Sequence, residues 1–257
     1  MELLSSSPLK ILNIVPMKTR NKIALCIAPA RLLLTVMLAV GLPTAYCIAQ
    51  QPKEEVDAKA KAILDEVAAK TKSYSSIKVE FTNVTEKTET NAKSKVTDTQ
   101  SGTLQLKGEK FKMEIKGQVI FCDGKTQWTY IKESNEVQIN DAPDSKSTDN
   151  PTPVNIFTIY EKGYKYKYEK EDVVAGAKVD IVDLFPLNPE KKSFHRIVLT
   201  IDRAKKQIIS VKIVDKHQGS STISVKTFTP NSEMPDAMFI FNKADYKGVE
   251  VVDLRDH

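Results

Sequence analysis

Few residues of this 257-residue chain have the types and spacing from which chemistry could start. The three histidines, His195, His217 and His257, lie too far apart in sequence to form a recognisable metal motif. Asp180 and Asp183 could pair as acid and base, but two acids in a strand are more often solvated side chains. Glycine-rich phosphate loops, HExxH, CxxC and GxSxG are all missing from the sequence. The sequence therefore predicts no catalytic residue, no metal and no cofactor, and it does not favour an enzyme.

The first 49 residues have the pattern of a secretory signal peptide. An apolar run at 32–42 follows several basic residues, and it is shorter than the roughly 20 apolar residues that a membrane span needs. We expect cleavage near Ala49, and Met17 is a plausible true start. Processing as a lipoprotein at Cys47 is the alternative, although the preceding residue is larger than such processing usually accepts. The expected mature protein is one domain, residues 50–257, in the periplasm.

Removing this leader changes what charge and cysteine content imply. The whole chain has a formal net charge of +5, but the leader holds five basic residues and one acidic residue. The expected mature protein therefore has 33 basic and 32 acidic residues. A net charge of +1 gives no reason to expect nucleic acid as a partner. Cys122 is the only cysteine after the leader, so no internal disulfide is possible and the domain must be held by its core. We expect Cys122 to be a small buried or strand-edge side chain rather than a reactive thiol.

Residues 101–141 predict the centre of an antiparallel sheet. Asp123-Gly124 lies between apolar alternations, which is a strong hairpin signal because both turn positions favour positive φ. Phe111, Met113 and Ile115 alternate with charged residues, so one face of this sheet must cover something apolar. The strands expected here are 102–107, 111–116, one ending at Cys122, one carrying Trp128 and Tyr130, and 137–140.

The remaining segments complete a mainly β fold with helices (α+β). Residues 53–72 carry an apolar stripe at helical spacing, and residues 153–161 could form a short helix. Polar residues 85–100 predict a long hairpin or a mobile loop. The tyrosines and lysines of 164–168 alternate, as in a strand with tyrosines on one face. Further strands are expected at 77–81, 178–184, 197–201, 209–213, 223–227, 239–241 and 249–254. A sheet of ten or more strands must curl.

The order of these elements resembles the LolA family of periplasmic outer-membrane lipoprotein carriers. The resemblance covers nearly all of residues 53–256, and its most specific part is the DGKxxWxY string at 123–130. Other matching pieces are GxLxLK at 102–107, KFKM at 110–113, Asn155-Ile156-Phe157, Phe239-x-Phe241 and GVEVVD at 248–253.

The resemblance implies an incomplete β-barrel closed by a helical lid over an apolar cavity. It implies a monomer that receives acylated lipoproteins from an inner-membrane ABC-type transporter and delivers them to an outer-membrane acceptor. One departure concerns release. Well-studied members carry Arg-Pro after the GxL strand, where this chain has Gly108-Glu109 beside Lys107, so lid closure, cargo or release could differ.

Alternation along the strands predicts the residues of the concave face, and these are the candidates to line an acyl-chain cavity: Phe81, Leu104, Leu106, Phe111, Met113, Ile115 and Trp128. Ordinary sheet core is an equally good interpretation of each single position. Ile63, Leu64 and Phe157 are the lid candidates. The alternative function is a non-enzymatic lipid- or lipoprotein-sensing regulatory module on the same fold, which would retain its ligand and pair with a signalling protein.

Overall fold

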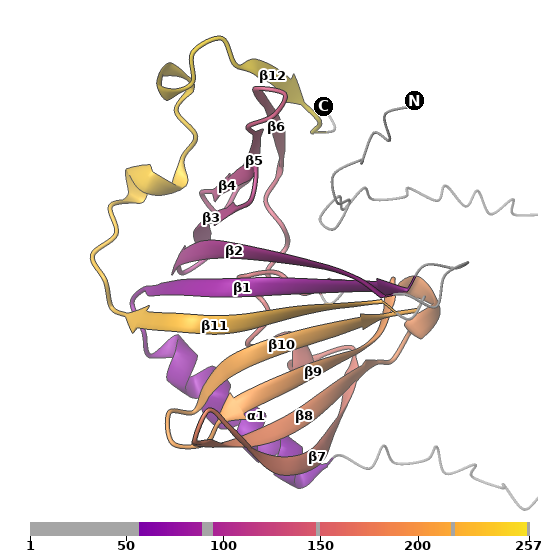
Figure 1. The fold of residues 1–257 in the computed structure, drawn as a ribbon. Helices are drawn as coiled ribbons and strands as arrows, with labels where there is room; N and C mark the ends of the chain where they lie inside the picture. Colours follow the sequence, from indigo (N-terminus) through magenta and orange to yellow (C-terminus); the bar gives the residue numbers. More distant parts are fainter. Residues whose placement is uncertain (1–56, 89–94, 148–149, 217–218, 256–257) are drawn as a thin grey trace, which may run out of the picture. The chain divides into compact units, whose positions relative to one another are not determined.

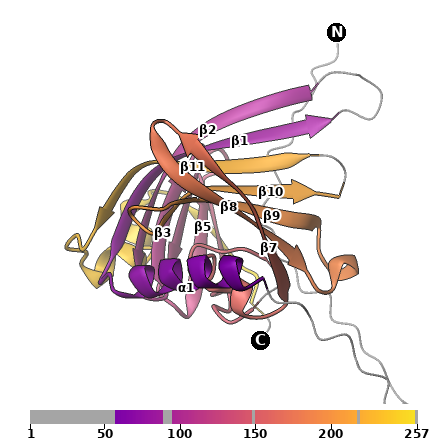
Figure 2. The ribbon, with the colours of Figure 1, turned by 90° about the horizontal axis from the view of Figure 1, so that it is seen from below.

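A computed structural model describes residues 57–88, 95–147, 150–216 and 219–255, and the predicted signal peptide and its cleavage site lie outside them. Twelve strands form one sheet in the order β12-β6-β5-β4-β3-β2-β1-β11-β10-β9-β8-β7 (Figure 1). All neighbouring pairs are antiparallel except β12 and β6. The sheet curves over helix α1 without closing, because β12 and β7 remain as edges (Figure 2).

The predicted fold class is therefore confirmed, and so is the run of hairpins from 101 to 141. The strands are β1 (Ile77–Thr88), β2 (Lys95–Lys107), β3 (Lys110–Ile115), β4 (Gln118–Cys122), β5 (Thr126–Ile131), β6 (Glu136–Asp141), β7 (Tyr164–Val174), β8 (Ala177–Pro186), β9 (Phe194–Asp202), β10 (Gln207–Asp215), β11 (Ser220–Pro230) and β12 (Glu250–Asp253). The polar segment 85–100 extends the β1–β2 hairpin on both sides of residues 89–94.

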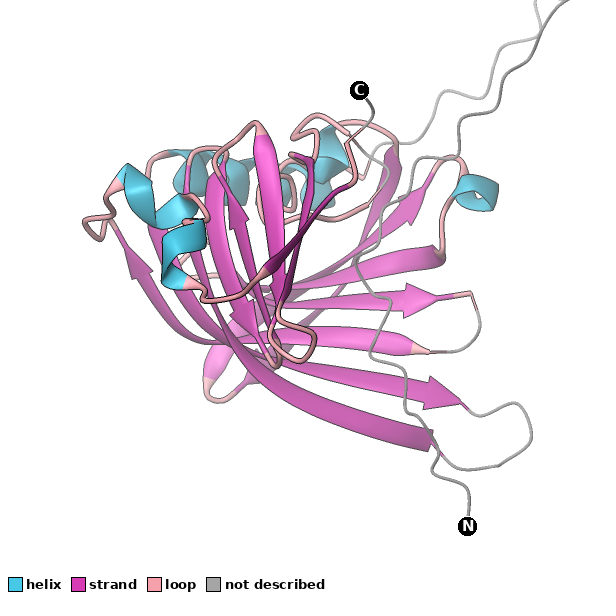
Figure 3. Ribbon diagram, turned by 90° about the horizontal axis from the view of Figure 1, so that it is seen from above, coloured by secondary structure: helices cyan, strands magenta, loops and turns pink. Residues whose placement is uncertain are grey.

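Helix α1 (Ala58–Lys72) is preceded by its N-cap residue, Asp57, whose side chain accepts a hydrogen bond from the Ala60 N–H. Its apolar stripe, centred on Leu64 and Val67, is buried against the sheet. Within the described residues, no helix is long and apolar enough to cross a membrane. Figure 3 shows the helical segments gathered mostly along one side of the strands.

Two predicted elements have a different conformation. Residues 153–158 form turns, and only Ile159–Glu161 is helical, as the 3-10 helix η1. The prediction of a strand at Phe239 and Phe241 was wrong, because Asp236–Phe239 is the 3-10 helix η3. A two-residue alternation of aromatics is too short to specify a strand, and Pro235 directly before η3 removes a backbone donor from the segment. Two further 3-10 helices are η2 (Pro189–Lys191) and η4 (Lys243–Asp245).

Gly102 lies inside β2 at a position where a larger side chain would not fit. A Cβ atom there would lie 2.6 Å from the Phe81 ring and 2.6 Å from the Glu114 carbonyl oxygen. Phe81 pairs with Gly102 across β1 and β2, so its ring lies over the space that a side chain would fill. The glycine therefore makes room for one of the largest side chains of the sheet interior.

We expect Gly102→Ala to destabilise the fold by about 1–3 kcal/mol, because the added methyl group must displace the Phe81 ring or the β3 backbone. Urea unfolding followed by circular dichroism measures this change. Ser101→Ala, at the exposed neighbouring position, is the control. Equal stability of the two variants would show that the close approach at Gly102 is unimportant.

Candidate functional site

The concave face of β1–β4 carries a continuous apolar surface. Cross-strand pairing brings Leu106 beside Phe111 and Leu104 beside Met113, and Ile115 lies opposite Gly102. Phe81, Leu106 and Phe111 are buried, and the other three predicted residues are half-buried against the same cluster. Six of the seven predicted cavity residues therefore lie together on one face.

Trp128 does not belong to this face, and its prediction was wrong. Across the β4–β5 hairpin Cys122 pairs with Gln127, and Phe121 pairs with Trp128. Cys122 belongs to the concave cluster, so Trp128 must point to the opposite side with Phe121. The C-terminal segment covers that side, where the Phe241 ring lies 6.0 Å from Phe121 and 6.5 Å from Tyr130.

A second buried cluster lies between α1 and β7–β10, and it contains two of the lid candidates. Leu64 is buried and Ile63 packs against the cluster from α1. The sheet side is formed by Tyr164, Val182, Leu184, Phe194, Ile197, Leu199, Ile201 and Ile208. Phe157, the third candidate, packs against both clusters and so joins the two halves of the concave interior. The three predicted lid residues thus face the sheet.

The turn that carries Phe157 is organised by a buried amide, Asn155, which was expected only as part of the string at 155–157. Asn155 is 1% exposed and accepts a hydrogen bond from the Thr152 N–H at 2.7 Å. Its Nδ2 donates to the carbonyl oxygens of Ser147 and Asn150. The proline-rich composition around it and the absence of a hydrophobic alternation were the available signals for a side-chain-bonded loop.

Polar contacts fasten α1 at several points along its length. Asp57 accepts a second hydrogen bond from the Tyr168 N–H at 2.7 Å, and the Lys59 ammonium lies 3.5 Å from the centre of the Tyr168 ring. The Tyr160 hydroxyl of η1 donates to Asp65 at 2.9 Å. A lid that moves must break these bonds as well as expose its apolar stripe.

Asp180 and Asp183, the two acids considered as a possible acid–base pair, each form an ion pair with an arginine. Arg203 pairs with Asp180 at 2.8 Å and Arg196 pairs with Asp183 at 2.9 Å. Burial tends to raise the pKa of Asp180, but bonds from Arg203 and Tyr168 outweigh it and lower that pKa. Burial raises the pKa of Asp183. Strand alternation turns these two carboxylates to opposite faces of β8, so they do not form an acid–base pair.

Metal and thiol chemistry find little support among the described residues. No group of three or more potential metal ligands occurs in the part of the chain that the structure describes. His195 is exposed, with Nδ1 at 3.1 Å from the Asp215 carbonyl oxygen. Cys122 is buried as expected, and burial raises the pKa of its thiol, which opposes formation of the reactive thiolate.

Lys107, which precedes the Gly108-Glu109 turn, contacts the C-terminal segment. Its Nζ donates to Asp236 at 2.8 Å and to the Met234 carbonyl oxygen at 2.9 Å. Lys110 binds the other oxygen of Asp236, and the bonds from the two lysines lower the pKa of Asp236 to about 2. The ion pairs of Lys107 and Lys110 with Asp236 therefore hold η3 against the β2–β3 hairpin.

Tyr160→Phe should loosen the lid without altering its apolar face, because it removes only the hydroxyl that binds Asp65. We expect a loss of about 0.5–1.5 kcal/mol in the free energy that closes α1 over the sheet. Hydrogen exchange of the α1 amides measures it. Tyr130→Phe removes an equivalent bond, to Asn135, and should leave α1 exchange unchanged. The same exchange in both variants would contradict a fastening role for Tyr160.

Acid should loosen the same helix. Bonds from the Ala60 and Tyr168 amides lower the pKa of Asp57 in the folded protein. Their stabilisation is complete above the unfolded pKa near 3.9 and disappears as the pH falls through the lower folded value. We therefore expect binding of a hydrophobic dye to rise as the pH falls below about 4.

Asp57→Asn keeps a helix cap but removes the charge, so it should bind more dye at neutral pH and respond less to acid. Asp236→Asn, which disturbs the C-terminal segment instead, is the matched control. A full acid response in Asp57→Asn would show that another group controls the opening.

The chain is similar to known proteins in both sequence and fold. The family model described as outer membrane lipoprotein carrier protein LolA matches residues 72–242. A search of curated proteins finds no significant match. Among solved structures, an uncharacterised conserved protein from Thermus thermophilus is similar at a TM-score of 0.50 and 13% identity, over 76% of this chain and 99% of that one.

Two other solved structures are more distant in shape. An outer membrane lipoprotein-sorting protein domain from Vibrio parahaemolyticus has a TM-score of 0.40 and 13% identity, over 74% of this chain and 98% of that one. Lipoprotein LppX from Mycobacterium tuberculosis has a TM-score of 0.44 and 11% identity, over 70% of this chain and 98% of that one. The family match covers well over half of the sequence, and the chain therefore belongs to the LolA family.

Proposed function

We propose that this protein is a periplasmic carrier that binds the acyl chains of lipoproteins between its concave sheet face and α1, and shuttles them from the inner to the outer membrane. The observation that carries the proposal is the joined apolar interior. Two clusters line the concave side, and Phe157 packs against both. Membership of the LolA family supports the same ligand class.

Magnitudes explain why such cargo needs a carrier. Burying one methylene is worth about 0.8 kcal/mol, so a 16-carbon chain costs on the order of 12 kcal/mol to expose to water. Transfer from a bilayer into an equally apolar interior is close to neutral by the same measure. A carrier therefore has to offer a dry interior and a cover that opens.

Loading must displace part of the protein's own core. Leu64 and Val67 of α1 are at most 2% exposed, and they pack on the sheet. Opening this cover exposes apolar surface, and the cost is recovered when acyl chains take its place. We propose that the opening is driven by an inner-membrane ABC-type transporter, and that an outer-membrane acceptor takes the cargo from the monomeric carrier.

The uptake of a fluorescent diacylated peptide tests the proposal, followed by its release to vesicles that contain outer-membrane acceptor. Full-length protein should bind the peptide with one-to-one stoichiometry and release it faster to acceptor vesicles than to plain ones. Retention of the peptide with stable pairing to a signalling protein would favour the sensing module instead. Failure to bind any diacylated peptide would overturn the proposal.

Met113→Gln should weaken peptide binding by about tenfold, because it places a polar amide of similar length on the concave face, at a cost near 1.4 kcal/mol. Trp128→Leu should leave binding unchanged, since the Trp128 side chain lies on the opposite face. Equilibrium titration of both variants measures this difference. A larger loss of affinity in the Trp128 variant would contradict the proposal, because it would place the binding surface on the face opposite the concave cluster.

A further inference from the structure

The sheet has an internal split between β10 and β11. These strands pair only over residues 210–214 and 220–224. Beyond that point β11 continues along β1 to Pro230, while β10 begins at Gln207 and stays paired with β9. The two strands therefore diverge toward the end of α1, and each has a backbone edge without a strand partner there (Figure 1).

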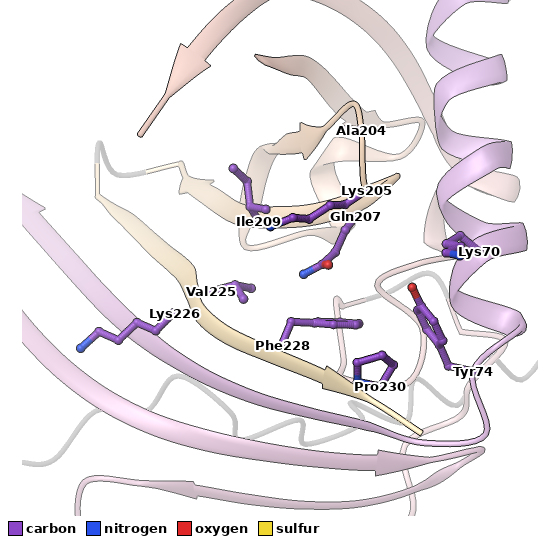
Figure 4. A pocket seen from close by; sticks show the side chains of 10 residues that line it. All are labelled: Lys70, Tyr74, Ala204, Lys205, Gln207, Ile209, Val225, Lys226, Phe228 and Pro230. Atoms are coloured by element: carbon purple, nitrogen blue, oxygen red, sulfur yellow. The ribbon is translucent and has the colours of Figure 1, made fainter. Parts of the chain in front are cut away.

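A cavity of about 440 Å³ occupies this split, within the range of small-molecule sites (Figure 4). Its residues come from the end of α1, the β9–β10 turn, β10 and β11: Lys70, Tyr74, Ala204, Lys205, Gln207, Ile209, Val225, Lys226, Phe228 and Pro230. No acidic residue is among them.

One side of the cavity is apolar and connects to the proposed acyl-chain interior. Tyr74, Val225 and Phe228 pack against the cluster of Phe81 and Phe111, and the rings of Tyr74 and Phe228 lie 5.7 Å apart. Val225 pairs directly with Phe81 across β1 and β11. An apolar chain in the split would therefore touch the same cluster that lines the concave face.

The other side is polar and positively charged. Figure 4 shows the ends of Lys205 and Gln207 on the wall opposite Phe228, with Lys70 across the split on α1. Lys70 lies in the last turn of the helix, and its Nζ is 5.6 Å from the Tyr74 ring centre. The Lys205 Nζ lies 3.9 Å from the Asp202 Oδ2, which is a long distance for an ion pair. Lys226 points away from the other lining side chains.

We propose that this split is the access route for an anionic lipid, whose acyl chain lies along Val225 and Phe228 toward the interior and whose phosphate headgroup binds Lys70 and Lys205. Charge complementarity favours an anion, and the amide of Gln207 adds a hydrogen-bond donor beside it. This inference rests on the proposed acyl-chain interior and narrows its ligand to a chain with a negatively charged head.

A peptide strand added to the free edge of β11 is a less good fit. The split narrows to full pairing at Ser210 and Ser224, so a strand between β10 and β11 could not continue past that point. An acyl chain needs no such continuation, because it can turn into the apolar interior beside Phe81.

The test is calorimetric titration of the full-length protein with dodecyl phosphate and with dodecyl maltoside, which share a chain but differ in charge, both below their micelle concentrations. We expect dodecyl phosphate to bind more tightly. The double variant Lys70→Gln/Lys205→Gln should bind dodecyl phosphate about tenfold more weakly and dodecyl maltoside unchanged. Lys125→Gln, in the β4–β5 hairpin, is the matched control and should behave as the unaltered protein.

A second readout locates the headgroup. Dodecyl phosphate should slow the acetylation of Lys70 and Lys205, measured by peptide mass spectrometry, but not that of Lys125. Equal affinity for the two amphiphiles, or an unchanged dodecyl phosphate affinity in the double variant, would overturn this inference. If either of these two results is found but the unaltered protein still binds a neutral diacylated peptide, the proposed carrier function stands. Only the proposed access route between β10 and β11 is then overturned.

Discussion

The width of the apolar concave face is the constraint on which the rest of the structure depends. Twelve strands at about 4.8 Å spacing span on the order of 50 Å, whereas a 15-residue helix is only about 22 Å long. Helix α1 can therefore cover the part formed by β7–β10 but not the whole interior. Val154 and Phe157, from the turns before η1, pack against the β1–β4 cluster, and Phe157 also packs against the cluster beneath α1. A cover built from two segments can open at their junction while the sheet remains intact.

The cover is held by two kinds of interaction with different consequences. Buried apolar side chains such as Leu64 and Val67 each contribute about 1.5–3 kcal/mol, and under the proposed function an incoming acyl chain replaces these contacts. The bonds of Asp57 and Tyr160 are directional and cannot be replaced by a hydrocarbon. They therefore favour one closed position of α1, and under the proposed function they are the contacts that must break during loading.

Local sequence patterns predicted most strands but could not assign every face. The Asp123-Gly124 hairpin was recognised, yet the side of Trp128 depends on which residue Cys122 pairs with, and alternation within one strand does not contain that information. The role of Phe157 likewise depends on Asn155 and its contacts with Ser147 and Asn150. The split beside Phe228 was missed because it arises from where two strands stop pairing, which is a property of the assembled sheet.

Native mass spectrometry of the protein purified gently from its own cells tests the central claim most directly. The joined interior beneath α1 predicts a population that carries one acylated polypeptide, released when the cover is opened by acid or organic solvent. Protein that is always free of acylated molecules, and that also fails to take up a diacylated peptide in vitro, would contradict an acyl-binding interior. The two apolar clusters would then be the hydrophobic core of the domain and nothing more.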